Sequence, residues 1–572
     1  MKTSRGTRAV RNFAAALRAG LAVACLLFPC AAFSQCSGSH TAAIHQAYEQ
    51  KNWDEVARLA QGQTPLSAED NFETGMALAH LQRWKEAHAA LLAGEQQCPT
   101  EKRFPIELGG VAFQEKRYPE AAGWLRRGLK LDPKDEYANN FAGTVYYLMG
   151  NLPAALEYWN RIGKPYITSL NFDSQLRVRR LLLDRAVAFS PAAVLEEPQL
   201  ETTDVRVDGL GIFSTYNIVL SARQDGNFDA EFHALERDGF GSPLAALVST
   251  FSGLPYETIY PSYYDMGRSA INVRSLLRWD KEKRRAWVAV ESPLRDLPQH
   301  RLQFSGDARN ENWAVRRSFT GIAPVLGSLN LERQTATASM DAFTTGRFQW
   351  SLGAEFSHRN YRNVVEGSAL PSSLLIPGSA LGFQASMQGK PLDVPVHRFT
   401  LTTSASSDTT RLWSTPTHIF EKVQGSALAH WFPQAQSNNW EVQQTVRGGG
   451  IVGAAPFDEL FMLGVERDND LWLRGHIGTR GGKKGSSPLG DRFFLANSDV
   501  YRRVYSNGLI GIEAGPLFDI GRMGAPANGL STSQWLFDTG VEAKLTVLGT
   551  NVVLTWGRDL RTGHNAFYGT AQ

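Results

Sequence analysis

The stretch RFQWSLGAEFS, Arg347–Ser357, alternates between apolar and polar side chains along its whole length. One face of an extended strand would carry Phe348, Trp350, Leu352, Ala354 and Phe356, and the other Arg347, Gln349, Ser351 and Glu355. The stretches FDTGVEAKLTV (537–547) and HRFTLTTSAS (397–406) repeat the pattern. Repeated alternation over about ten residues is typical of a transmembrane β-barrel with a watery lumen. Soluble β-sandwiches also alternate, but charges on the polar faces favour an antiparallel barrel over residues 295–572.

The start of the chain supports export. Residues 1–34 combine an apolar run from Gly20 to Phe33 with five cations and no acid: Lys2, Arg5, Arg8, Arg11 and Arg18. This pattern predicts a secretory signal peptide cleaved after Ser34, with a membrane anchor as the alternative. Cleavage would remove five positive charges, so the formal net charge of +3 would become about −2 (3 − 5). The mature chain is therefore not expected to bind nucleic acid.

The mature sequence has no run of 18 apolar residues, so no transmembrane helix is predicted. Because only helices and closed barrels span membranes, an exported chain of this kind is either soluble or a barrel. Cys36 and Cys98 are the cysteines left after cleavage, and we predict that they form a disulfide in an oxidising compartment. Two cysteines give no metal motif, and we expect no metal, cofactor or nucleotide.

A repeat of 34 residues precedes the strand-rich region. Its small residues are Gly75, Gly109 and Gly143, followed twelve residues later by Ala87, Ala121 and Ala155. The phrases RWKEA, RYPEA and NLPAA lead to these alanines, and Pro133 closes one unit. This period resembles the tetratricopeptide repeat (TPR), in which small residues let two antiparallel helices approach closely. The resemblance predicts an α-helical TPR solenoid over residues 38–190 that presents a concave face to partner proteins, with an irregular helical bundle as the alternative.

Residues 200–293 mix helical and strand patterns after a linker rich in Pro and Glu. Two strands are expected at Asn272–Arg278 and Arg285–Glu291, joined by the turn DKEK. A helix and a short helix would precede them, with Tyr264 near the end of the short helix and Gly267 at its stop. This order resembles a POTRA domain, the small α+β periplasmic module that precedes outer-membrane assembly barrels. The alternative is a generic α+β linker domain.

A further motif lies in DNDLWLRGHIGTRGGKKG, Asp468–Gly485, which places Arg474-Gly475 in a long loop after an apolar triplet. The strand LFDIG, 517–521, follows downstream. This order resembles the outer-membrane assembly superfamily that includes BamA, TamA and the two-partner-secretion transporters. In that family a loop folds into the lumen, and its Arg-Gly pair meets an aspartate of a Phe-x-Asp-x-Gly strand and a second acid.

The resemblance implies that Arg474 and Gly475 are the loop pair, that Asp519 is the aspartate and that Asp499 is the second acid. His476 departs from the family, which usually has Tyr or Phe after the glycine, and Leu517 replaces the first Phe of the strand motif. A guanidinium can hold a carboxylate through two parallel hydrogen bonds, and such a contact can order a long loop. Arg474 is thus expected to fix the loop and not to catalyse.

The sequence is compatible with two functions. The resemblance implies an assembly or translocation factor in the outer membrane, whose periplasmic modules bind client polypeptides and periplasmic or lipoprotein partners. A TPR-containing exopolysaccharide export porin is the alternative. An enzyme is not expected, because GxSxG and HExxH are absent from the sequence and no catalytic residue is predicted. The acidic pairs Asp458/Glu459 and Asp538/Glu542 are better interpreted as rim or lumen charges.

Overall fold

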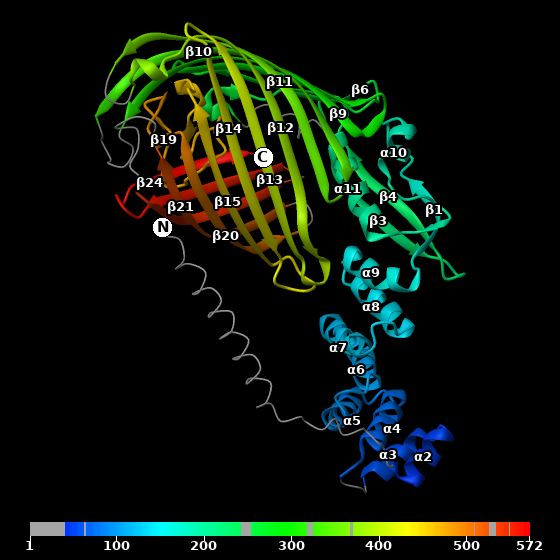
Figure 1. The fold of residues 1–572 in the computed structure, drawn as a ribbon. Helices are drawn as coiled ribbons and strands as arrows, with labels where there is room; N and C mark the ends of the chain where they lie inside the picture. The colour runs from blue at the N-terminus through cyan, green and yellow to red at the C-terminus, as the bar shows by residue number, and fades with distance from the viewer. Residues whose placement is uncertain are drawn as a thin grey trace, which may run out of the picture. The chain divides into compact units, whose positions relative to one another are not determined.

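The computed structural model describes residues 40–61, 65–241, 253–316, 324–366, 370–507, 510–524, 534–547 and 550–571. The predicted signal peptide, residues 1–34, lies outside this part of the chain. The chain divides into two compact units, residues 1–138 and 139–572, and the boundary falls inside helix α8 (Glu136–Leu148) (Figure 1). The helical repeat predicted from the sequence therefore extends from the first unit into the second.

The described part of the first unit is helical. Its helices are α2 (Ala42–Glu49), α3 (Trp53–Gln61), α4 (Ala68–His80), α5 (Trp84–Gln97), α6 (Arg103–Gln114) and α7 (Tyr118–Leu131). An added Cβ at Gly75 would lie 2.6 Å from Leu91 Cγ, and one at Gly109 would lie 3.0 Å from Leu125 Cγ. These glycines therefore let α4 approach α5, and α6 approach α7, more closely than a larger residue would.

The second unit opens with another helix pair of the same kind. In it α8 packs on α9 (Leu152–Trp159), and a Cβ at Gly143 would collide with the indole ring of Trp159. The three repeat alanines, Ala87, Ala121 and Ala155, are each 0% exposed. The small residues at the repeat positions thus lie at close helix contacts in these three pairs, and Pro133 follows the end of α7. Among the described residues, no helix has both the length and the apolarity needed to span a membrane.

Cys98 ends helix α5 as its C-terminal cap and is 2% exposed. It is disulfide-bonded. Its predicted partner, Cys36, lies outside the described residues, so the pairing of these two cysteines stays a prediction.

A small α+β domain follows in the second unit. Its elements are β1 (Tyr166–Phe172), α10 (Arg180–Ala186), β2 (Ala193–Val194), α11 (Glu197–Leu210), β3 (Phe213–Ala222) and β4 (Phe228–Glu236). The strands form a sheet in the order β2-β1-β4-β3, in which β1 and β4 are parallel. Residues 166–190, which the sequence analysis assigned to the helical repeat, belong to this domain. That prediction was wrong because β1 is defined by its pairing with a strand some 60 residues later.

The hairpin predicted for the POTRA-like domain is part of the barrel. Its strands are β7 (Ile271–Trp279) and β8 (Lys283–Leu294), and β8 pairs along most of its length with β9 (Leu297–Arg316). The short helix expected around Tyr264 is strand β6 (Ser262–Met266), which pairs with β7. The boundary at residue 293 was therefore wrong, because the barrel ladder already begins at β5 (Thr258–Ile259).

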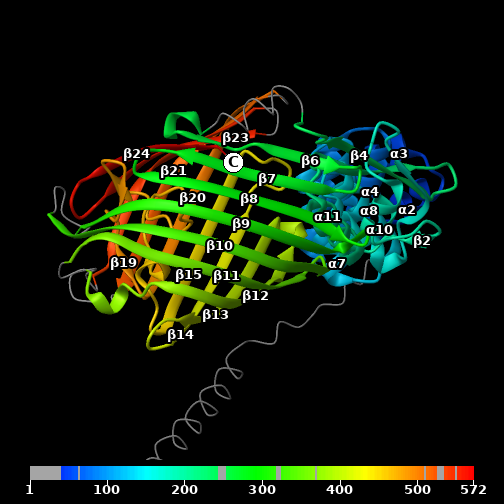
Figure 2. The ribbon, with the colours of Figure 1, turned by 90° about the horizontal axis from the view of Figure 1, so that it is seen from above.

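The barrel is closed, and its wall strands follow one another in the order β10-β11-β12-β13-β14-β15-β20-β21-β22-β23-β24-β5-β6-β7-β8-β9 (Figures 1 and 2), with β15 paired directly to β20. Its remaining long strands are β10 (Val325–Thr345), β11 (Phe348–Val365), β12 (Gly378–Val394), β13 (Phe399–Trp413), β14 (His418–Trp431) and β15 (Trp440–Gly453). After a long interval come β20 (Arg492–Ser506), β21 (Ile510–Gly524), β22 (Leu536–Val547), β23 (Thr550–Asp559) and β24 (Asn565–Ala571).

The barrel strands expose apolar side chains and bury charged ones. On β11, Leu352 is 53% exposed, whereas Arg359 is 1% exposed. On β22, Val541 is 51% exposed, whereas its neighbour Glu542 is 7% exposed. The alternation predicted from the sequence is confirmed, and its direction is the reverse of that in a soluble protein, which exposes charge and buries apolar surface.

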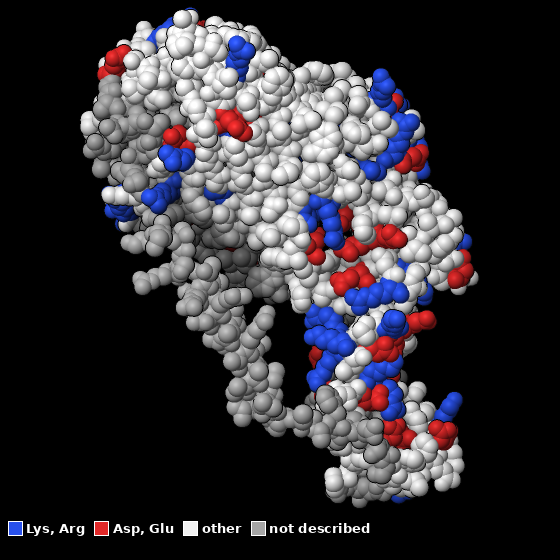
Figure 3. Space-filling model, in the orientation of Figure 1, with Lys and Arg blue, Asp and Glu red and all other residues white. Residues whose placement is uncertain are grey.

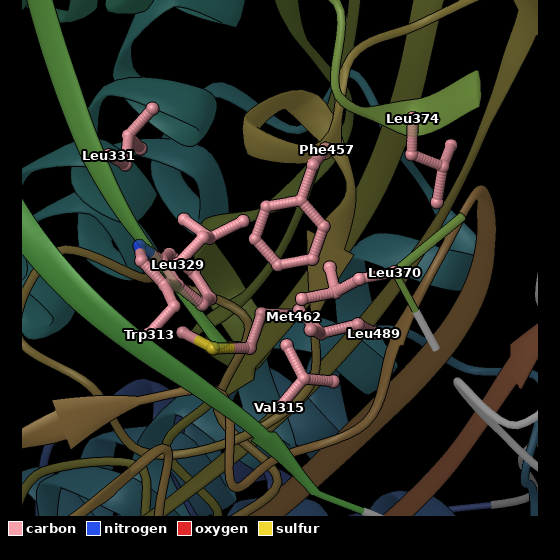
Figure 4. Packing of buried hydrophobic residues seen from close by; sticks show 9 residues of the cluster. All are labelled: Trp313, Val315, Leu329, Leu331, Leu370, Leu374, Phe457, Met462 and Leu489. Carbon is pink, nitrogen blue, oxygen red and sulfur yellow. The ribbon is translucent and has the colours of Figure 1, made fainter. Parts of the chain in front are cut away.

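Buried hydrophobic residues form an apolar cluster against strands β9 and β10 (Figure 4). It joins side chains of the wall to others from chain segments that connect the strands: Trp313, Val315, Leu329, Leu331, Leu370, Leu374, Phe457, Met462 and Leu489. Trp313 and Phe457 meet edge to face with ring centroids 5.1 Å apart. The cluster therefore fixes the connecting segments to β9 and β10.

Candidate functional site

We call residues 454–491, between β15 and β20, the inward segment. It contains the short elements η5 (Phe457–Glu459), β16 (Phe461–Met462), β17 (Thr479–Arg480), β18 (Lys483–Lys484) and β19 (Leu489–Gly490). Strands β16 and β19 pair with each other, so the chain near the start of the inward segment lies beside the chain near its end. Its charged side chains contact wall strands on both sides of the barrel, from β7 and β8 to β10, β11, β20, β21 and β22. The segment therefore lies inside the lumen.

A second apolar cluster holds the part of the inward segment that leads to Arg474. Its buried members are Phe461, Leu463, Leu471, Leu473, Phe493, Leu495, Met523 and Leu536. Leu471 and Leu473 belong to the apolar triplet that precedes Arg474 in the sequence, and they are 4% and 0% exposed. Between them, Trp472 donates a hydrogen bond from Nε1 to the Glu466 carbonyl oxygen, 3.2 Å away. The backbone on the N-terminal side of Arg474 is therefore packed in place.

The structure brings Arg474 together with both predicted acids. The Arg474 guanidinium donates from Nε to Asp519 Oδ1 at 3.1 Å and from Nη2 to the same oxygen at 2.5 Å. Its backbone N–H donates to Asp519 Oδ2 at 2.9 Å. The Nη1 atom donates to Asp499 Oδ1 at 2.5 Å. Arg474 is 6% exposed and Asp519 is 0% exposed, so this contact is shielded from water.

A third carboxylate, which the sequence analysis did not connect with Arg474, completes the site. Glu542 of β22 accepts from Arg474 Nη1 at 3.4 Å, and it also accepts from Tyr501 Oη at 2.6 Å. Asn497 of β20 donates to Asp519 Oδ1 at 2.8 Å and to the Trp472 carbonyl at 2.9 Å. One guanidinium thus joins three buried carboxylates from three neighbouring strands.

Gly475 lies where no side chain fits. An added Cβ would lie 2.5 Å from the Asp559 backbone nitrogen and 2.7 Å from Asp538 Cγ. The Gly475 backbone N–H donates to Asp538 Oδ2. His476 follows directly, and its Nδ1 lies 3.1 Å from the same Oδ2 atom. The glycine therefore lets the segment approach β22 and β23 at backbone distance.

Asp468, the first residue of the stretch 468–485, makes a second set of charged contacts. It accepts from Arg278 Nη1 of β7 at 2.8 Å, from Arg285 Nη1 of β8 at 2.6 Å and from Lys484 Nζ at 2.9 Å. Lys484 in turn donates to Glu311 of β9 at 2.6 Å. Asp468 therefore ties the inward segment to the strands that the sequence analysis had placed outside the barrel.

A third set of contacts lies at the start of the inward segment. Asp458 accepts from Arg333 Nη1 of β10 at 3.0 Å and from Tyr361 Oη of β11 at 2.6 Å. Glu459 accepts from Arg359 Nη2 of β11 at 3.1 Å. From the sequence this acidic pair is interpreted as rim or lumen charge, and the structure places both acids in the lumen. Alternation on β10 and β11 was the signal that could have identified their partners.

These contacts suit the site for holding a chain segment. Planar guanidinium groups meet carboxylates in hydrogen-bonded pairs at three separate places in the lumen. A buried ion pair is weak as a source of stability, but removing one partner leaves a charge without compensation. The arrangement therefore specifies one position for the inward segment, and that position can change only if several pairs separate together.

Comparison with known proteins gives matches in solved structures. No family model and no curated protein matches the sequence. BamA from Haemophilus ducreyi lacking POTRA domains 1–3 is 11% identical, with 71% of this chain and 84% of that chain covered at a TM-score of 0.41. CdiB from Escherichia coli is 13% identical, with 72% and 76% covered at 0.49. CdiB from Acinetobacter baumannii is 10% identical, with 71% and 73% covered at 0.42. At these identities the likeness concerns the fold alone. The chain is thus similar to solved structures of BamA and CdiB.

Proposed function

We propose that this protein is an outer-membrane factor that assembles or translocates other polypeptides. In this proposal the TPR-type helices and the small POTRA-like domain receive clients in the periplasm, and the barrel inserts or exports them. The observation that carries the proposal is the inward Arg-Gly loop. Arg474 is buried against Asp519, Asp499 and Glu542 of the lumen wall, in the arrangement implied by the resemblance to this superfamily.

The outer surface of the barrel supports a membrane location. Its wall carries exposed apolar side chains on several strands, among them Phe304, Leu352, Phe383, Val541 and Leu554. Figure 3 shows a broad barrel face with few charged residues, whereas the charged residues gather over other parts of the chain. An outward apolar band around a charged interior suits a lipid environment, because a closed barrel satisfies its backbone hydrogen bonds without water.

The small α+β domain supports a role in receiving clients. Strand β3 (Phe213–Ala222) stands at the end of the sheet order β2-β1-β4-β3. A strand at the end of a sheet can pair with an extended segment of another polypeptide, which is the β-augmentation mode of recognition. Main-chain pairing depends little on side chains, so it suits a module that must accept many sequences.

The proposed action needs no catalysis, because assembly and translocation rearrange hydrogen bonds and leave covalent bonds unchanged. The buried charges of the lumen would then act by holding the inward segment in position. We therefore propose no catalytic role for Arg474 or its acidic partners. A nucleotide or another cofactor is likewise not part of the proposal.

The proposal is tested by depleting the protein in its native cells and comparing the outer-membrane and secreted fractions by quantitative mass spectrometry. We expect the loss of specific polypeptides, restored by the intact gene and by the Arg362→Ala variant but restored less by Arg474→Ala. Arg362 is a suitable control because it pairs with Glu332 outside the inward segment, and its side chain is 57% exposed. Reduced export of polysaccharide with an unchanged protein profile would refute the proposal and support the export porin.

A further inference from the structure

Three aspartates stand side by side across neighbouring strands of the lumen wall. Asp519 of β21 is the register partner of Asp538 of β22, and Asp538 is the register partner of Asp559 of β23. They are 0%, 0% and 2% exposed. Like charges placed directly opposite each other in a sheet are destabilising, and the repulsion grows where water is excluded. The row therefore requires positive charge from the lumen side.

Arg474 supplies that charge at one end of the row only. Its guanidinium donates to Asp519, Asp499 and Glu542. The next acid, Asp538, accepts from the backbone N–H of Gly475, which follows Arg474. Asp559 accepts from the Arg561 backbone N–H at 2.9 Å and from the Thr562 hydroxyl. Because these donors are neutral, compensation of the negative charge of the Asp538–Asp559 pair falls to the side chain of His476.

His476 lies between the two aspartates. Its Nδ1 is 3.1 Å from Asp538 Oδ2, and its Nε2 is 3.7 Å from Asp559 Oδ2. One ligand atom from each of the three residues lies within 4.8 Å of the others, and all three residues are buried. Asp538 Oδ1 is buried and has no hydrogen-bond partner in the described part of the chain. A carboxylate oxygen in that position is costly unless it binds a cation or a donor.

We propose that His476, Asp538 and Asp559 form a binding site for one divalent cation of the zinc class. An imidazole nitrogen and carboxylate oxygens are zinc ligands, at about 2.0–2.2 Å from the ion. Two ligand atoms on one tetrahedral ion lie about 3.3–3.6 Å apart at such distances. Only one imidazole nitrogen would bind the ion, and the three ligand atoms lie within 4.8 Å of one another, so the side chains would move closer together around the ion. Three protein ligands leave a fourth position for water.

The ion would compensate both aspartates and the buried Asp538 oxygen at once. It would also join the inward segment, through His476, to strands β22 and β23, one step along the row from the Arg474 contact. Because the site forms only when the segment is in place, the free energy of metal binding would stabilise that position. Local sequence gave no metal motif, since the three ligands are separated by 62 and 21 residues (476, 538 and 559).

The test uses the purified full-length mature protein in detergent, stripped with a chelator and then titrated with Co²⁺ alone. We expect saturable visible absorption bands at about one ion per chain, displaced by Zn²⁺. We also expect the heat-unfolding midpoint to rise with added Zn²⁺ and to fall again with chelator. In the variants His476→Gln and Asp559→Asn, affinity should fall at least about 100-fold.

The matched control is His564→Gln, which removes an exposed histidine close in sequence to Asp559. It should bind Co²⁺ as the unaltered protein does. Absence of saturable Co²⁺ binding by the unaltered protein would overturn the proposal whether or not the variants fold. Binding that persists in His476→Gln would also overturn it, because the ion would then lie elsewhere. In either case, a positively charged His476 side chain would be what compensates Asp538 and Asp559. The heat stability of the protein would then be independent of metal and would fall as pH rises.

Discussion

The sharpest test of the lumen site is removal of the Arg474 side chain. Arg474→Ala would leave Asp519, Asp499 and Glu542 together, and these three carboxylates are 0%, 8% and 7% exposed. Their remaining donors are neutral, such as Asn497 to Asp519 and Tyr501 to Glu542. The variant would therefore hold three neighbouring negative charges in the lumen without the cation that now joins them.

The expected cost follows from this geometry. Removing one partner of a buried ion pair typically costs about 3–5 kcal/mol. For a domain of this size, that loss lowers the midpoint of heat unfolding by about 6–15 °C. Asp519→Asn should cost less, because Arg474 keeps Asp499 at 2.5 Å and Glu542 at 3.4 Å. The double variant Arg474→Ala with Asp519→Asn should be more stable than Arg474→Ala alone, since one of the three charges is then gone.

The assay is a double-mutant cycle on the purified barrel in detergent. Heat unfolding is followed by circular dichroism and by loss of the fast-migrating form on unboiled denaturing gels. We expect a coupling of at least about 1 kcal/mol between the two sites. The control cycle uses Arg362→Ala and Glu332→Ala, an ion pair with side chains 57% and 32% exposed, for which about 0–1 kcal/mol is expected.

Additive effects in the Arg474–Asp519 cycle would refute the reasoning. So would a double variant less stable than Arg474→Ala, because relief of like-charge repulsion requires the opposite order. Either result would mean that the inward segment does not hold its arginine against the wall in solution.

Further predictions concern the membrane location, the glycine of the loop, the disulfide and the small domain. The mature chain should be recovered in the outer membrane and should migrate faster unboiled than boiled; intact mature protein in the soluble periplasm would contradict this. Gly475→Ala should destabilise the barrel by about 1–3 kcal/mol, because the added Cβ would lie 2.5 Å from a backbone nitrogen. The control Gly306→Ala should change the stability little, because the nearest atom to its added Cβ would lie 4.0 Å away. Mass spectrometry without reductant should find Cys36 joined to Cys98, and two free thiols would exclude the pair. Burial, and then a neighbouring aspartate, raise the pKa of Asp204 to about 6. The stability that the protonated Asp204 carboxyl contributes is therefore present below about pH 4 and is lost as pH rises through 6. Asp204→Asn should flatten the pH dependence of unfolding between those two values.

Much of the fold is readable from local sequence. Strand alternation identifies the barrel because a side chain two residues along a strand returns to the same face. The 34-residue repeat identifies the helix pairs because Gly75, Gly109 and Gly143 occupy equivalent close contacts. Both signals are carried by residues near one another in the chain, so one sequence is enough to find them.

The domain boundary could not be found in this way. The hairpin of β7 and β8 has the alternation of any antiparallel hairpin, and nothing within it tells which sheet its outer edges join. Its assignment to the barrel depends on the ladder between β8 and β9 and on the closure through β5 and β24. In the same way, β1 is a strand because β4 lies beside it, although some 60 residues separate them.

Some residues of the candidate site can likewise be predicted from local sequence, whereas others are found only in the tertiary structure. Arg474, Gly475, Asp519 and Asp499 could be named from sequence, because the loop and strand motifs occur in a familiar order. The partners of Asp468 and of Asp458 could not, because Arg278 and Arg333 lie 190 and 125 residues away along the chain. The row from Asp519 to Asp559 likewise exists only through the register of β21, β22 and β23. Sequence periodicity determines which face of a strand a charge occupies, whereas pairing and register decide which charges meet, because contacts across a closed barrel join segments that no local pattern relates.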